Sequence, residues 1–231
     1  MLLGLLVTVL AQTVAAQNAS KLDDPIGGEC RIDNPRFLHP CNSGMAIDQL
    51  ARKANVLVGF ENTPDCQPSG RSLKAGATSE ILTGMSARQA FDHLMTLMPM
   101  YAWKEMNGVV VVRPKAAWDN PRDLLNLPTN PFDATNARVD DVLHVLLHAV
   151  TPSVFIPHED VPRPQGPINR PVAVVFSGGT MLDALNAIAR AHGGIGWQLG
   201  YPSRHNAVIT SNTLEFSGDS VIAPVAVPPG R

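Results

Sequence analysis

The stretch that decides the fold is residues 177–199, SGGTMLDALNAIARAHGGIGWQL, because it repeats the pattern of residues 83–105, TGMSARQAFDHLMTLMPMYAWKE. Each stretch opens with a glycine and a hydroxyl residue, continues through an apolar stripe and reaches a tryptophan. Matching residues in the two stretches are separated by the same number of positions, which indicates that the chain contains one unit twice. The residues that lie 94 positions apart are Ser86 and Thr180, Ala90 and Ala184, Leu94 and Ile188, and Trp103 and Trp197.

Both stretches are predicted to contain an amphipathic helix followed by two strands. The hydroxyl residue stands where it can accept hydrogen bonds from first-turn N–H groups, and the apolar residues behind it recur at helical spacing. Pro99 is expected to end the first helix, and Gly193 with Gly194 the second. A stretch with the tryptophan follows, and then a β-rich run, GVVVV (108–112) in one copy and NAVIT (206–210) in the other.

The likeness extends upstream at a spacing one residue different. Residues 46–60, AIDQLARKANVLVGF, align with residues 141–155, DVLHVLLHAVTPSVF. Each predicts an amphipathic helix and a short apolar strand. The sequence therefore predicts an α+β fold of two tandem small α/β-sandwich units, residues 36–114 and 131–213, each with two helices packed on a small mixed sheet.

The segments outside the two units are predicted from their composition. Residues 17–35 are expected to form a leader, and the Pro-rich residues 115–130 a linker, because proline does not suit a central strand. A second Pro-rich stretch, residues 151–171, is expected to be a surface excursion within the second unit. The tail, residues 214–231, is expected to be disordered.

The first residues indicate export. Residues 2–16, LLGLLVTVLAQTVAA, are apolar and uncharged, and the run is shorter than the roughly 20 residues that a spanning helix requires. Val14 and Ala16 stand where a small-residue cleavage site requires them. Residues 1–16 are therefore predicted to be a signal peptide of a periplasmic or secreted protein, with no membrane span after cleavage. An uncleaved N-terminal anchor is the alternative.

The overall charge argues against nucleic acid as a partner. The chain carries 18 Lys and Arg residues against 20 Asp and Glu residues, a formal net charge of −2. These basic residues form no long cluster that could follow a phosphate backbone. The 45% hydrophobic content is enough to build a core.

The three cysteines, Cys30, Cys41 and Cys66, lack the spacing of a metal site. In an oxidising compartment, one disulfide and one remaining thiol is the simplest arrangement. A Cys30–Cys41 bridge is the preferred prediction because it would close a short loop around the turn-prone DNP (33–35). Pairing of either residue with Cys66 remains open.

The two units resemble the secretin and TonB short N-terminal domain, in two tandem copies over residues 36–213. In the first unit, the resemblance lies in AIDQLARKANVLVGFE (46–61) and LTGMSARQAFDHLMTLMPMYAWKEMNGVVVV (82–112). The residues that fit the family cadence are Leu82, Gly84, Ser86, Ala90, Phe91, Tyr101 and Gly108 to Val112. In the second unit, FDATNARVDDVLHVLL (132–147) resembles the start of such a domain and VVFSGGTMLDALNAIARAHGGIGWQL (174–199) its later half.

This resemblance implies a small α/β-sandwich module of the bacterial cell envelope. Members of the family belong to secretin channels or precede outer-membrane receptor barrels, where they contact signalling or assembly partners. We therefore expect a free-standing periplasmic module for protein–protein recognition. Its partner would be a secretin, a receptor or a signalling protein.

A search for catalytic chemistry yields one candidate. Asp141, His144 and His148 are spaced to share one face of a helix, which can bind a metal ion. The alternative is that they form the solvent face of that helix, because no HExxH glutamate is nearby. We therefore expect no enzyme, no cofactor and no metal, with an exported metal-dependent hydrolase as the alternative function.

The strand Val109, Val110, Val111 and Val112 is the predicted partner-binding segment. Four consecutive valines favour an extended backbone, and a strand at the edge of a sheet can accept a strand from another protein. The alternative is a central strand that is paired on both sides. Trp103 and Trp197, which could stack on a ligand, are expected instead to pack in or beside the core because they hold equivalent places in the repeat.

Overall fold

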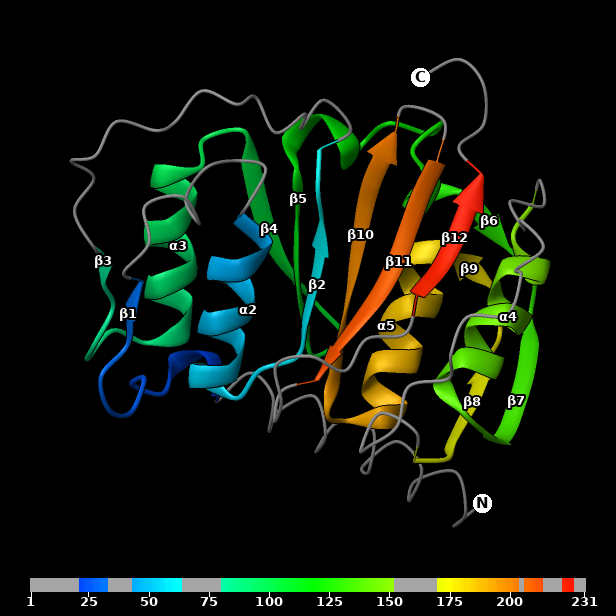
Figure 1. Ribbon diagram of the computed structural model, residues 1–231, viewed down its shortest axis with the longest axis horizontal. Helices are drawn as coiled ribbons and strands as arrows, with labels where there is room; N and C mark the ends of the chain where they lie inside the picture. Colours follow the sequence, from blue (N-terminus) through cyan, green and yellow to red (C-terminus); the bar gives the residue numbers. More distant parts are fainter. Residues whose placement is uncertain are drawn as a thin grey trace, which may run out of the picture.

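A computed structural model (Figure 1) describes residues 21–32, 43–63, 80–151, 170–203, 206–213 and 222–226. The predicted signal peptide, Cys41 and Cys66 lie outside these ranges, as do residues 152–169 of the second Pro-rich stretch. The fold is mixed α+β, as predicted from the sequence. Within the described ranges, every helix is too short or too polar to cross a membrane.

The order of elements in the first half of the chain recurs in the second half. The first half contains β1 (Arg31–Ile32), α2 (Ser43–Ala54), β2 (Val58–Glu61), β3 (Glu80–Ile81), α3 (Ala87–Leu97), β4 (Tyr101–Met106) and β5 (Val109–Pro114). The connecting segment contains η2 (Lys115–Ala117), η3 (Leu124–Asn126) and β6 (Pro128–Thr129). The second half contains β7 (Phe132–Ala137), α4 (Val139–Ala149), β8 (Val172–Phe176), β9 (Gly179–Thr180), α5 (Met181–His192), β10 (Ile195–Ser203), β11 (Asn206–Thr213) and β12 (Ile222–Ala226).

The two halves share one central sheet. Its six strands follow the order β12-β11-β10-β2-β5-β4, so each half contributes three neighbouring strands. The halves meet where β10 runs parallel to β2, with Trp197 opposite Gly59. The sequence predicts a separate small sheet in each unit, whereas the structure joins them because the edge of β2 is covered by β10 rather than left unpaired.

Helices α2 and α3 lie on one face of this sheet, and helices α4 and α5 lie on the other. Val110 and Val112 of β5 belong to the core that contains the buried residues of α2 and α3. Val109 and Val111 belong to the core that contains those of α4 and α5. The alternating side chains of one strand therefore complete both cores. Two small antiparallel sheets, β1–β3 and β7–β8, lie outside the helices at the two ends of the molecule (Figure 1).

The two tryptophans make the same contact in the two halves. Trp103 of β4 donates its indole N–H to Asp92 of α3 at 2.8 Å. Trp197 of β10 donates its indole N–H to Asn186 of α5 at 2.9 Å. Each tryptophan lies in the first strand of a hairpin, and the two acceptors are also 94 positions apart.

The helix starts are also alike. The Ser86 hydroxyl accepts a hydrogen bond from the Gln89 backbone N–H, and the Gln89 side chain accepts one from the Ser86 N–H. Thr180 and Asp183 form the same reciprocal pair at the start of α5. Such capping boxes satisfy N–H groups that a helix leaves without partners. The α5 helix ends at Gly193, whose φ of 72° suits glycine.

Parts of the predicted leader and linker are built into the fold. Pro25 forms an antiparallel bridge with Ser86, and Pro128 pairs with Thr180 in the same way. Leu22 before the first bridge and Leu125 before the second are buried. Burial of these apolar residues explains why the two segments fold against the units on either side of them. The first unit therefore includes residues that precede its predicted start at residue 36.

Part of the predicted tail forms a strand, β12. Residues Ile222–Ala226 pair antiparallel with β11, and Pro224 lies opposite Val208. Proline is acceptable there because β12 is the last strand of the sheet. Residues 214–221 and 227–231 of the predicted tail lie outside the described residues.

Removing either cap is expected to destabilise the whole molecule. Ser86→Ala and Thr180→Ala should each lower the free energy of unfolding by about 1 kcal/mol, because each leaves a first-turn N–H without its acceptor. Since the halves share one sheet, both variants should shift a single transition in urea unfolding monitored by circular dichroism. Thr180→Ser keeps the hydroxyl and serves as the control. Two separate transitions would contradict the cooperative coupling of the halves.

Candidate functional site

The predicted binding strand is not an edge. Strand β5 pairs parallel with β2, Val110 opposite Val58 and Val112 opposite Phe60, and antiparallel with β4 over its whole length. All four valines, Val109 to Val112, are buried. The strand is therefore the central, doubly paired alternative and offers no free edge to a partner strand. The apolar run has a different physical cause, because this strand faces a core on each side.

Among the described residues, the ends of the central sheet are β4 and β12. Strand β4, residues Tyr101–Met106, pairs with β5 along one side, and no described strand pairs with its other side. Lys104 and Glu105 in the middle of β4 are exposed. Charged residues on an edge strand discourage unselective pairing with other chains. This edge therefore has the backbone groups that a partner strand requires and charges that restrict access to them.

One face of β4 is held by α3. The Trp103 ring packs against Phe91, with 5.6 Å between ring centroids, and the Arg88 guanidinium lies 5.8 Å from the indole centroid. Arg88 in turn donates to Asp23 at 2.7 Å. These contacts fix the direction of the Trp103 side chain at the edge of the sheet.

The other face of β4 leads to a buried cluster of charges. The Lys104 ammonium lies 4.3 Å from the centroid of the Trp118 ring. The Arg113 guanidinium carbon lies 5.2 Å from the same ring. Trp118 therefore contacts both an exposed cation on the sheet edge and a buried cation in β5.

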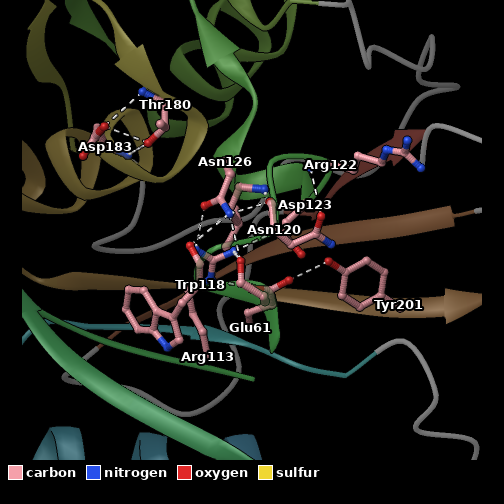
Figure 2. Close-up of polar contacts among 12 residues, drawn as sticks. Glu61, Arg113, Trp118, Asn120, Arg122, Asp123, Asn126, Thr180, Asp183 and Tyr201 are labelled. Atoms are coloured by element: carbon pink, nitrogen blue, oxygen red, sulfur yellow. Dashed lines mark hydrogen bonds and ion pairs between the residues drawn. The ribbon is translucent and has the colours of Figure 1, made fainter. Parts of the chain in front are cut away.

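Arg113 is the centre of this cluster (Figure 2). Its side chain is fully buried, and its Nε donates to Glu61 Oε2 at 2.6 Å. One terminal nitrogen, Nη2, donates to Asp123 Oδ1 at 2.7 Å, and the other, Nη1, donates to Asn126 Oδ1 at 2.9 Å. The donors of the guanidinium are thus matched to acceptors in β2 and in the connecting segment.

The connecting segment folds around Arg113 through its own polar groups. Asp123 accepts a hydrogen bond from the Leu125 N–H and so caps η3. The Asn126 side-chain amide donates to the carbonyls of Ala117 and Asn120, both at 2.8 Å. The segment predicted as a linker therefore supplies two of the groups that hold the buried arginine.

The second half of the chain reaches the cluster through Tyr201 of β10. The Tyr201 hydroxyl donates to Glu61 Oε1 at 2.8 Å. The cluster therefore joins strands β2 and β5, the connecting segment and strand β10 at one place (Figure 2).

Among the described residues, the charges of the cluster do not cancel when both acids are ionised, because one guanidinium then faces two carboxylates. Burial raises the pKa of Glu61 from 4.5 to about 7, and the negative charge of Asp123 acts in the same direction. The positive charge of Arg113 and its hydrogen bond to Glu61, together with that from Tyr201, oppose this rise in pKa only in part. Glu61 is therefore poised to exchange a proton near neutral pH.

The sequence contains a weak signal for this cluster. Glu61 and Arg113 each follow an apolar run, in VGFE (58–61) and VVVVR (109–113), where both faces of the strand are buried. A charged residue at the end of such a run requires a partner of opposite charge. No local pattern identifies Asp123 as a partner of Arg113. Asp123 lies in a Pro-rich segment, and its contact with Arg113 is set by the tertiary fold.

The residues of the alternative metal-site reading lie on the surface. Asp141, His144 and His148 are exposed on α4, whose buried side consists of Val139, Val142, Leu143, Leu146 and Leu147. In the ranges that the structure describes, no group of three or more His, Cys, Asp or Glu side chains gathers where it could hold a metal ion.

Cys30 is buried beside α2 and α3, and burial raises the pKa of its thiol. It forms no disulfide with any residue that the structure describes. Because Cys41 and Cys66 lie outside the described residues, the Cys30–Cys41 bridge stays a prediction.

No family model matches this chain, and no curated protein or solved structure matches it significantly.

Proposed function

We propose that this chain is a cell-envelope recognition module that binds an extended segment of a partner protein along strand β4. The observation that carries the proposal is the position of β4 at the end of the central sheet, with one side unpaired among the described residues. An extended segment can pair with such an edge, where main-chain hydrogen bonds supply affinity and side-chain contacts supply selectivity. This mode of binding requires neither catalysis nor a cofactor.

The side chains beside β4 favour a specific segment over an arbitrary one. Trp103 offers an apolar ring on one face of the strand, while Lys104 and Glu105 place opposite charges on successive residues. Successive side chains of a strand point to opposite faces. A partner with an acidic residue on the Lys104 face and an apolar residue on the Trp103 face would complement this edge.

The envelope setting is supported by the sequence. The apolar residues 2–16 have the character of a signal peptide, and the two halves resemble the secretin and TonB short N-terminal domain. Proteins with that domain act with secretins, receptors and signalling proteins of the envelope. We propose the same class of partner and a periplasmic location for this chain. We also propose that it acts as two tandem modules of this family, joined through their sheets.

Proline substitutions in β4 should separate partner binding from folding. Successive N–H groups of a strand point to opposite sides, so the N–H groups of Lys104 and Glu105 differ in direction. One of Lys104→Pro and Glu105→Pro should unfold the sheet by removing a hydrogen bond to β5. The other should stay folded. In an envelope extract, it should no longer crosslink to a partner protein that does crosslink to wild-type protein.

Lys115→Ala, on an exposed residue just beyond β5, is the control and should retain the partner. The proposal fails if the folded proline variant retains the same partner as wild type. It also fails if every protein that crosslinks to wild type also crosslinks to the folded variant.

A further inference from the structure

We propose that the Glu61–Arg113–Asp123 cluster is a proton-operated latch, which holds the two halves of the central sheet together when the cluster carries one proton and loosens them when that proton leaves. This inference does not depend on the proposed function. It rests on where the cluster lies, which charges it contains and how they are buried.

The cluster lies at the junction between the halves. Among the described residues, strand β2 meets β10 through three residue pairs, and Glu61 forms the last of them, opposite Leu199. Arg113 lies on the neighbouring strand β5, and the Tyr201 hydroxyl from β10 donates to the Glu61 carboxylate. A change in the charge of Glu61 therefore acts directly on the backbone pairing that joins the halves.

The balance of charge depends on one proton. With a proton on Glu61, one guanidinium faces one negative charge among the described residues, and their charges cancel. Without that proton, two of the described carboxylates share one guanidinium, and this excess of negative charge away from water is unfavourable. The described groups that face the cluster include Glu61 from β2, Arg113 from β5, Trp118, Asp123 and Asn126 from the connecting segment, and Tyr201 from β10, with Lys104 of β4 on the Trp118 ring.

The pH range follows from the direction of the shift. Burial and Asp123 raise the pKa of Glu61 from 4.5 to about 7 in the folded protein. When the junction opens, water reaches Glu61 and its pKa returns toward 4.5. Because the closed form holds the proton more tightly, its extra stability is fully present below pH 4.5 and is lost as the pH rises through about 7. The latch is closed in mild acid and loosened in mild alkali.

Amide hydrogen exchange in β2 and β10 measures the opening directly. After correction for the intrinsic pH dependence of exchange, the opening equilibrium of wild-type protein should rise on the order of a hundredfold from pH 5 to pH 8. Glu61→Gln keeps the size of the side chain and imitates the protonated acid. Its opening equilibrium should stay near the low-pH value of wild type throughout.

Two further variants complete the test. Asp123→Asn removes the charge that helps to raise the pKa of Glu61, so loosening should be complete at lower pH and have a smaller amplitude. Glu29→Gln, at an exposed residue outside both the cluster and strand β4, should behave as wild type. The latch is disproved if Glu61→Gln keeps the wild-type pH dependence. It is equally disproved if Glu61→Gln is already open at pH 5, or if Asp123→Asn leaves the profile unchanged.

Discussion

Gly196→Ala is expected to separate the two halves of the central sheet and to destabilise the protein by roughly 3 kcal/mol or more. Gly196 lies in β10 beside β2, and a Cβ at this position would overlap the Val58 carbonyl oxygen. The obstacle is backbone, so no side-chain rotation can relieve it. Urea unfolding at constant pH should show the loss of stability, and hydrogen exchange should rise first in β2 and β10.

Gly27→Ala is the matched control, because a Cβ at Gly27 would meet no atom within 4 Å. It should leave stability within about 0.5 kcal/mol of wild type. If Gly196→Ala were as stable as Gly27→Ala, the close approach of β10 to β2 would not exist in solution.

Arg113→Met is expected to destabilise the protein by about 3–5 kcal/mol at pH 7, because it leaves the Glu61 and Asp123 carboxylates buried without a cation. The loss should be smaller at pH 5, where Glu61 can take up a proton, since its raised pKa would rise further without the guanidinium. Urea unfolding at the two pH values measures both effects.

The variant that also carries Glu61→Gln and Asp123→Asn should recover much of the lost stability, because no unpaired charge remains buried. Lys115→Met removes an exposed cation just beyond β5 and should change stability little. A loss below about 1 kcal/mol for Arg113→Met would mean that the cluster is open to water, contrary to the burial of its side chain.

The local structure was predictable where the sequence carries local signals. The helix starts at Ser86 and Thr180 follow from hydroxyl residues before apolar stripes, and these positions hold the capping boxes of α3 and α5. The end of α5 follows from Gly193. Such features depend on residues within a few positions of each other, so a single sequence is sufficient to locate them.

The pairing of strands was not predictable in the same way. The valines of β5 suit an edge or a centre equally in composition, and only their two neighbours, β2 and β4, decide between them. The glycines that permit the junction, Gly59 and Gly196, carry no local mark of a close approach. The candidate site was missed for the same reason, because Tyr201 reaches Glu61, and Asp123 reaches Arg113, only once the chain has folded.

The parallel pairing of β2 with β10 also has a consequence for the order of folding. Tyr201 and Glu61, which meet at this junction, are 140 residues apart in the chain. Closing so long a loop costs more entropy than forming the local hairpins β4–β5 and β10–β11, so those hairpins are expected to form first. Until β10 arrives, one side of β2 and the valines of β5 that face α5 lack their cover. During synthesis, the N-terminal half therefore exposes an incomplete sheet with unpaired backbone groups and apolar side chains until the second half has been made. We expect the chain to be most prone to aggregation, and most dependent on chaperones, in this interval.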